Sequence, residues 1–342
     1  PAAMARSPST ASRSSADHTA CRLAGVTRLP ATRPLARLRW CATLLALPAC
    51  LLPLSAFACA CGCGVFDVGT ASMFPARSGG TVFIEEDYVD QDRNWSGSSR
   101  APAADNEDRE VRTWFTTVGG TYSFNADWSL SVRVPYWQRH FATRDEASGD
   151  PVDFDHGALG DVRVTGTWTG LSADRSTGVV FGLKLATGDY TYGGFDRDTA
   201  IGTGTTDTLL GLWHQGNLST MHRLNWFAQS LWEHALGERA GYAPGDELDL
   251  ALGAYREGDT GSGGFKLSPL LQLVYTWHAH DRGVESMPED TGYQRLLLAP
   301  GLELRQGAWR AYADVSLPLW QDVRGNQLVA PALYKLIVSR AF

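Results

Sequence analysis

The stretch Leu130–Trp137 reads LSVRVPYW, with a strongly apolar residue at every second position. On an extended strand, successive side chains point to opposite faces. One face here is apolar and the other is mixed: Leu130, Val132, Val134 and Tyr136 share the first, and Ser131, Arg133, Pro135 and Trp137 share the second. Helical spacing fits this pattern less well, so the stretch predicts a β-strand.

Similar alternation recurs along the chain in segments of about ten residues, each ended by Gly, Asn, Asp, Ser or Pro. The predicted strands are 80–90, 111–124, 128–138, 159–169, 178–190, 205–215, 222–234, 247–257, 263–277, 294–305, 308–320 and 327–342.

The connections between these segments alternate in length. Long ones follow the odd segments, at 91–110, 139–158, 191–204, 235–246 and 278–293. Short ones follow the even segments, at 125–127, 172–177, 217–221, 258–262 and 306–307, and a short final connection is expected at 321–326. Short turns at one end and longer loops at the other, with an even strand number, are typical of a transmembrane β-barrel.

Aromatic residues weigh against the alternative of a soluble β-sandwich, in which they would be spread along the strands. They gather near segment ends, as in the aromatic girdles of membrane barrels: Trp114, Tyr122, Phe124, Trp128, Tyr136, Trp137, Trp168, Trp213, Trp277, Trp309 and Trp320. The segment Leu336–Phe342 resembles the carboxy-terminal recognition signal of outer-membrane barrels. We therefore predict an all-β fold, a transmembrane antiparallel up-and-down β-barrel of 12 strands.

Composition excludes several other classes of protein. The chain has 342 residues, of which 20% are charged and 44% hydrophobic, and its formal net charge is -7. This balance excludes a disordered polymer and a strongly basic nucleic-acid-binding protein. After residue 64 no run reaches the roughly 18 to 20 apolar residues of a membrane-spanning helix, which excludes a polytopic helical membrane protein.

The amino-terminal region carries the features of an export signal. A positive stretch with three arginines precedes the apolar residues 40–54, and Ala56-Phe57-Ala58 forms a small-residue cleavage site. We predict that residues 1–58 are an N-terminal extension and signal peptide that is removed, and that residues 59–79 form a cysteine-containing periplasmic segment. Residues 80–342 then form a barrel in the outer membrane of a Gram-negative envelope.

Three cysteines at alternate positions, Cys59, Cys61 and Cys63, follow the predicted cleavage site. Closely spaced thiolates suit Cu(I) or Zn2+, and an exported compartment also permits disulfides. The spacing lacks the separated pairs of a structural zinc site, and C-x-C thiols bridge each other only with strain. An oxidised or partner-bound tail, a metal site on these thiols and a lipid anchor at Cys59 all remain open.

Two glycine-containing motifs lie in the middle of the chain: Phe181–Tyr190 reads FGLKLATGDY and Ile201–Asp207 reads IGTGTTD. A G-x-K-x-P-T-G-D strand followed by G-T-G-x-x-D resembles the outer-membrane barrel family named for the MetA pathway of phenol degradation, a family of proposed transporters. Ala186 stands where that family usually has Pro, and Gly157–Val162 resembles the preceding strand. The resemblance covers about residues 110–342 and implies transport of small molecules, aromatic or hydrophobic if it extends to function.

If the apolar strand faces contact lipid, the alternating charged residues face the barrel interior. The predicted lumen residues are Arg133, Arg163, Lys184, Glu233, Asp249, Lys266, Glu303, Arg310, Asp314 and Lys335. Charges of both signs are compatible with a structural network that fills a narrow barrel and with a polar pathway that selects a solute.

The long loops are acidic, but they lack the pattern of a known cation site. Asp150, Asp153 and Asp155 lack the glycine and terminal glutamate of a calcium loop, which favours a solvated surface. His278 and His280 share one strand face and offer two Zn2+ or Cu2+ ligands, although two exposed imidazoles are the simpler interpretation.

These features together predict a porin-like passive channel or transporter for small molecules, embedded in outer-membrane lipid. No Ser and His pair with a nucleophile turn stands out, so we expect no enzymatic activity, no catalytic residue and no cofactor other than Cu or Zn at the cysteine tail. The alternative is a non-conducting barrel that anchors a periplasmic protein partner or a metal through Cys59, Cys61 and Cys63.

Overall fold

The computed structural model describes residues 79–145 and 147–342, so the predicted signal peptide and the three cysteines of the tail lie outside the described residues. No helix in the described ranges is long and apolar enough to cross a membrane. The strands and two short 3-10 helices are β1 (Gly79–Gln91), β2 (Arg93–Gly97), β3 (Ser99–Arg100), η1 (Ala103–Asp105), β4 (Glu110–Ser123), β5 (Trp128–Arg144), β6 (Pro151–Leu159), β7 (Val162–Trp168), β8 (Thr177–Leu185), β9 (Asp207–Ser219), β10 (Leu224–Ala235), β11 (Glu247–Arg256), η2 (Ser262–Gly264), β12 (Phe265–His278), β13 (Tyr293–Gln306), β14 (Trp309–Val329) and β15 (Leu333–Ala341).

The strands form one closed antiparallel sheet. Consecutive strands pair around the ring, and β1 pairs with β15, from Thr81 opposite Ala341 to Val89 opposite Leu333, which closes the barrel. β6 and β7 both pair with β5 and share one position in the ring, while β2 and β3 lie off the ring and pair with β14 and with each other. The described ring therefore contains 12 strands, which confirms the predicted fold class.

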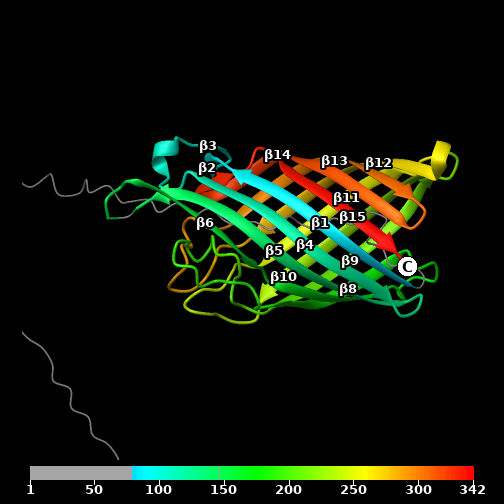
Figure 1. Cartoon of the computed structure of the whole chain (residues 1–342), viewed down its shortest axis with the longest axis horizontal. Coiled ribbons are helices and arrows are strands. Elements are labelled where there is room, and N and C mark those ends of the chain that lie inside the picture. The colour runs from blue at the N-terminus through cyan, green and yellow to red at the C-terminus, as the bar shows by residue number, and fades with distance from the viewer. Residues whose placement is uncertain (1–78, 146) are drawn as a thin grey trace, which may run out of the picture. The chain divides into compact units, whose positions relative to one another are not determined.

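The two ends of the barrel differ in their connections (Figure 1). At the end that holds the C-terminus, called here the turn end, short turns join β4 to β5, β7 to β8, β9 to β10, β11 to β12 and β13 to β14. At the opposite end, called the loop end, lie the longer segments 92–109, 186–206, 236–246 and 279–292. In an outer-membrane barrel the long loops face the outside and the short turns face the periplasm.

The predicted long loop 139–158 is wrong over most of its length. β5 continues to Arg144, β6 begins at Pro151, and the connection spans only 145–150. This part of the hairpin projects past the paired wall, since β6 has β5 as its one strand partner. A strand outside the lipid needs no apolar face, so its residues read as a polar loop in the sequence.

The predicted final connection at 321–326 is also wrong. β14 continues through it to Val329, with a register shift between Val323 and Asn326, and residues 330–332 make the connection to β15. The extension is held by β2, which pairs with it from Gly97 opposite Val323 to Arg93 opposite Val329. Pairing with a segment far away in the chain is not visible in local alternation.

The outer surface of the barrel is apolar and carries aromatic side chains towards both ends. Val82, Ile84 and Leu212 are between 51% and 55% exposed on this face. Near the loop end, Tyr88 contacts Trp114 and Tyr334 at ring-centroid distances of 4.5 and 6.1 Å. Such a surface is stable in lipid rather than in water, with aromatic rings at the interfaces.

Trp137 and Trp213 depart from the predicted girdles, because both point into the barrel. Trp213 is 5% exposed and its ring covers Gly178, the residue directly opposite on β8. A Cβ atom at Gly178 would lie 2.4 Å from the indole nitrogen, so a glycine makes room for the ring. A position near the end of a strand does not tell whether an aromatic side chain points inward or outward. The alternation of side chains along the strand does tell this.

The barrel interior has an apolar part as well as a charged part. A cluster that includes Phe227, Leu297, Tyr312 and Ile337 is buried on the inner faces of β10 to β15. These side chains fill that side of the interior and stabilise the barrel by removing apolar surface from water. The charged side chains and the open space lie mainly along β1 and β4 to β11.

Candidate functional site

A cavity of about 340 Å³ lies inside the barrel. Its walls are the inner faces of the strands, and three loops from the loop end also reach it. The contributing loop residues are Arg197, Asp198, Ala200, Ile201 and Thr203 of 186–206, Tyr242, Pro244 and Gly245 of 236–246, and Asp281 of 279–292. The loops therefore reach into the lumen at the loop end.

One wall of the cavity carries a charge network on β1, β5 and β15. The Glu85 carboxylate lies 2.7 Å from the Arg133 guanidinium and 3.1 Å from the Lys335 ammonium. Lys335 also lies 3.3 Å from Asp87. Glu85 and Lys335 are buried, so the pairing offsets much of the cost of removing these charges from water.

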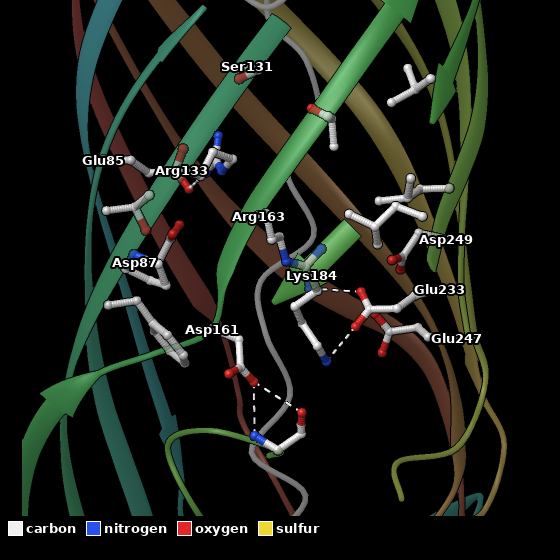
Figure 2. Close-up of a pocket in the computed structure, with 18 of the residues that line it drawn as sticks. Glu85, Asp87, Ser131, Arg133, Asp161, Arg163, Lys184, Glu233, Glu247 and Asp249 are labelled. Atoms are coloured by element: carbon white, nitrogen blue, oxygen red, sulfur yellow. Dashed lines mark hydrogen bonds and ion pairs between the residues drawn. The ribbon is translucent and has the colours of Figure 1, made fainter. Parts of the chain in front are cut away.

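A second network faces the first across the cavity, as Figure 2 shows. Lys184 on β8 contacts Asp207 on β9, and its ammonium lies 2.6 Å from the Glu233 carboxylate on β10. Arg163 on β7 contacts the other oxygen of Glu233 at 2.9 Å. Four neighbouring strands thus place their charges in one continuous cluster because each contributes an inward residue at the same height.

Carboxylates outnumber cations along the cavity. Beyond Glu233, the same wall carries Glu247, which accepts a hydrogen bond from Tyr293 at 3.3 Å, and Asp249, which accepts one from Thr276 at 2.7 Å (Figure 2). Among the described lining residues, eight are acidic and four are basic. An acidic, water-accessible lining raises the local concentration of cations.

The predicted lumen residues occupy three kinds of position. Arg133, Arg163, Lys184, Glu233 and Asp249 line the cavity. Four more have the inward parity of their strands but do not line the cavity: Lys335, Asp314, Glu303 and Arg310. The first three are buried. Lys266 has inward parity too, but it is exposed beside the turn at 257–264 and does not line the cavity.

Sequence reasoning missed several charged residues of the cavity. Glu85 and Asp87 alternate with Ile84 and Glu86 on β1, so the same parity rule identifies them. Glu247 alternates with Leu248 in the same way. Asp198, in contrast, lies on a loop that enters the lumen, and no periodic signal marks such a residue.

The glycine motifs build the rim of the barrel at the loop end. Asp161, at the break between β6 and β7, accepts hydrogen bonds from the Thr187 and Gly188 amides at 3.1 and 2.8 Å. Its second oxygen accepts from the Thr203 amide at 2.9 Å and from the Thr203 hydroxyl at 3.0 Å. One carboxylate therefore ties both ends of the loop 186–206 to the strand break.

The two motifs meet at Gly188 and Gly202, where their backbones lie against each other. A Cβ atom on Gly202 would lie 2.4 Å from the Gly188 carbonyl carbon, and one on Gly188 would lie 2.7 Å from the Gly202 Cα. The two backbones can approach this closely only without side chains. The motifs thus have a structural role where they meet.

Two loop carboxyl groups titrate near neutrality. Burial, and then the neighbouring Asp281 carboxylate, raise the pKa of Asp198 to about 7. Asp281 itself accepts hydrogen bonds from the Tyr242 hydroxyl at 2.9 Å and the Gly245 amide at 2.8 Å. Burial also raises the pKa of Asp108, in the segment 92–109, to about 7.

The two histidines considered as metal ligands make other contacts. His278 stacks on Tyr293 at a centroid distance of 5.3 Å and lines the cavity. His280 places Nδ1 3.2 Å from a guanidinium nitrogen of Arg324. A cation held against one imidazole is unfavourable for a metal ion there.

Comparison with known proteins supports the class of fold. No protein-family model matches the sequence, and no curated protein does. An outer-membrane channel from Pseudomonas putida F1 superposes with a TM-score of 0.59 at 12% identity, over 81% of this chain and 100% of that chain. The β-domain of the Bordetella autotransporter BrkA gives a TM-score of 0.46 at 11% identity, over 78% of this chain and 100% of that chain.

At 12% identity, the similarity to the Pseudomonas putida channel shows the fold alone. The apolar outer surface of the barrel shows that this fold is stable in lipid. The described chain is a bacterial outer-membrane β-barrel. The resemblance to the phenol-degradation family is not confirmed by a family match and remains a prediction.

Proposed function

We propose that the barrel is a passive channel or transporter for small molecules, with the lumen as the pathway. The single observation that carries the proposal is the cavity of about 340 Å³ between the two charged walls. A barrel whose interior served stability alone would gain more from filling this space with apolar side chains, since buried ion pairs contribute little net stability. Charges that line open space are useful when a solute or water passes them.

The residues that line the cavity favour small solutes that have an apolar body and a polar group. Phe83, Phe115, Trp137, Trp213 and Leu231 line the cavity beside the charged residues. Aromatic surface next to fixed charges favours amphipathic aromatic molecules over sugars or large ions. Amphipathic aromatic solutes agree with the substrate class that the family resemblance implies. This choice of substrate class is part of the proposal.

Permeation into proteoliposomes tests this function. Vesicles with the folded chain are compared with empty vesicles for entry of phenol, benzoate and benzylamine, which share one ring and differ in charge. The proposal predicts protein-dependent entry, fastest for benzylamine because the lining is acidic. Equal entry of all three with and without the protein would contradict it.

Removal of the segment 59–78 separates the channel from the alternative, an anchor that acts through Cys59, Cys61 and Cys63. Permeation is expected to continue without this segment. Loss of a bound metal or periplasmic partner, with no permeation before or after the deletion, would favour the anchor.

A further inference from the structure

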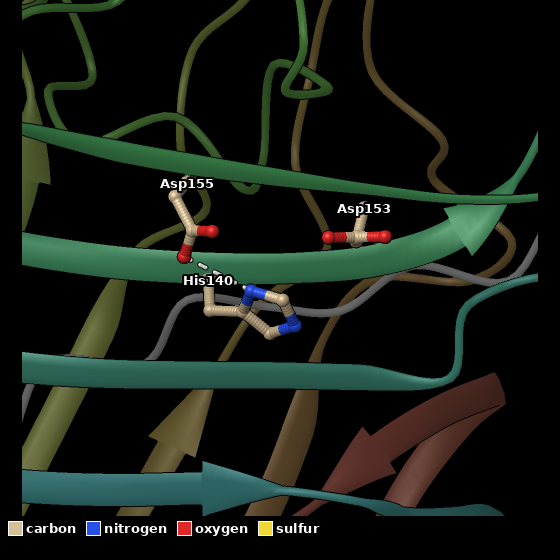
Figure 3. Close-up of side chains that lie close together, drawn as sticks. All are labelled: His140, Asp153 and Asp155. Atoms are coloured by element: carbon tan, nitrogen blue, oxygen red, sulfur yellow. Dashed lines mark hydrogen bonds and ion pairs between the residues drawn. The ribbon is translucent and has the colours of Figure 1, made fainter.

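Three metal-ligating side chains lie together on the hairpin that projects at the loop end. His140 on β5 is directly opposite Asp155 on β6, and Asp153 is two residues away on the same face. One donor atom from each of the three residues lies within 4.8 Å of the other two (Figure 3). Among the described residues this is the one such group of three.

We propose that His140, Asp153 and Asp155 bind a divalent transition metal ion, with Zn2+ as the best match. One imidazole nitrogen and two carboxylate oxygens suit Zn2+, whereas Ca2+ and Mg2+ prefer oxygen donors alone. Zn2+ binds nitrogen and oxygen at about 2.0 to 2.2 Å, which separates two ligand atoms of a tetrahedral ion by roughly 3.4 Å. The His140 Nδ1 and an Asp155 oxygen are 3.0 Å apart in a hydrogen bond, so a metal ion that binds both atoms would replace the proton between them and widen this separation slightly.

No described arginine or lysine pairs with Asp153 or Asp155, and the one described partner of Asp155 is His140 within the same group. Asp153 is exposed and has no hydrogen bond or ion pair with any other described residue. Arg112, the cross-strand neighbour of His140 on β4, instead contacts Glu110 at 2.8 Å. Arg144 donates to the Gly149 carbonyl at 2.8 Å. No arginine on the strands beside the group therefore pairs with either aspartate.

The space around Asp153 allows the ligands to close on an ion. The residue opposite Asp153 on β5 is Ala142, whose side chain is a single methyl group. The Asp153 carboxylate therefore has room to move towards His140. The donor atoms lie within 4.8 Å of one another, and this movement would shorten their separation to the one that metal coordination requires. Three protein ligands and water would complete a four-coordinate ion.

Binding would also have a structural effect on the hairpin. β6 is paired on one side only, with β5. A metal ion that joins His140 on β5 to two residues of β6 would fix this extension above the membrane, next to the loop 186–206. The His156 imidazole on β6 already contacts Asp189 of that loop at 2.8 Å.

Equilibrium binding of Zn2+ and Co2+ to the folded full chain tests the site. The parent and all variants carry serine at the six cysteines of the full chain, Cys21, Cys41, Cys50, Cys59, Cys61 and Cys63, because these thiols would otherwise bind the same metals. We expect one equivalent of Zn2+ to bind, and the variants His140→Ala and Asp153→Asn/Asp155→Asn to bind it roughly tenfold more weakly or worse, the least that loss of a ligand should cost.

The matched control is His156→Gln, which removes an imidazole from β6, the strand of Asp153 and Asp155, but from the opposite face of that strand. It should bind Zn2+ as tightly as the parent, and Co2+ bound to the parent should lack the charge-transfer absorption that thiolate ligands give. Heat-modifiable migration on a gel verifies that each variant is folded. Equal Zn2+ affinity in the parent and the His140→Ala variant, or no stoichiometric binding at all, would overturn the proposal.

Discussion

Lys184 is the cation on which the second charge network depends. It contacts both Asp207 and Glu233, and Asp207 is completely buried. Lys184→Met should lower the free energy of unfolding by about 3 to 5 kcal/mol, because buried carboxylates lose their partner. Denaturant titration in detergent measures this, and Glu233→Gln should restore part of the loss.

Lys266→Met is the control, since that lysine is exposed outside the cavity. Its effect should stay within about 0.5 kcal/mol. Equal losses for the two lysine variants would mean that the network has no special role in stability.

Gly253 shows how single glycines let large rings pack inside a narrow barrel. Its Cβ atom would lie 2.4 Å from the Phe227 ring and 3.0 Å from the Gln272 Cβ. Because Phe227 is fully buried and its ring cannot move aside freely, Gly253→Ala should destabilise the barrel by about 1 to 3 kcal/mol. Gly120→Ala is the comparison, as its nearest contact is an ordinary 3.4 Å, and the same loss in both variants would contradict this explanation.

At the scale of elements, the carboxylate of Asp161 joins both ends of the loop 186–206 to the break between β6 and β7, beside other contacts such as that of His156 with Asp189. Asp161→Ala removes four hydrogen bonds to Thr187, Gly188 and Thr203 and should make this loop more accessible to protease and hydrogen exchange. Asp161→Asn retains one acceptor oxygen and should give an intermediate effect. Unchanged exchange of the loop amides in Asp161→Ala would show that other contacts hold the loop.

The same loop should loosen as the pH rises. The Asp198 pKa of about 7 lies above the ordinary value of 3.8, so the folded loop favours the protonated carboxyl group. Its contribution to stability is complete at low pH and is lost as the pH rises from about 4 through about 7. Hydrogen exchange of residues 186–206 should therefore report increasing opening over this range.

Asp198→Asn should remove most of that pH dependence. Asp108 also titrates at about 7 in another loop, so the residual dependence should disappear in the double variant with Asp108→Asn. Parallel pH profiles for wild type and Asp198→Asn would contradict the assignment.

The elements of the fold were predictable to different degrees. Each of the twelve barrel positions follows from local alternation, because lipid outside and a mixed interior impose a period of two on every spanning strand. The hairpin of β5 and β6 outside the lipid, and the end of β14 paired with β2, escape the pattern because no apolar face is required there.

For the interior, parity identified Arg133, Arg163, Lys184, Glu233 and Asp249, and it also marks Glu85 and Glu247. It could not find Asp198 or Asp281, which reach the lumen through folded loops. Nor could it bring His140 to Asp155, since that pairing depends on the length of the hairpin. Strand parity thus predicts the walls of a barrel, whereas loop contacts require the structure.

At the scale of the whole molecule, the barrel combines an apolar exterior, a partly apolar core and an acidic cavity reached by loops. The described residues that line the cavity, from strands and loops together, include eight acidic and four basic ones. A pathway with this lining should pass cations in preference to anions, and the preference should weaken when Glu247 and Asp249 are replaced by their amides.

Single-channel current across a planar bilayer with a salt gradient tests the central claim, that the lumen is a pathway. For folded protein, verified by heat-modifiable migration, we expect discrete current steps and a reversal potential of the sign that cation selectivity gives. A folded protein that inserts and remains silent would contradict a conducting lumen and would favour a barrel that serves as an anchor.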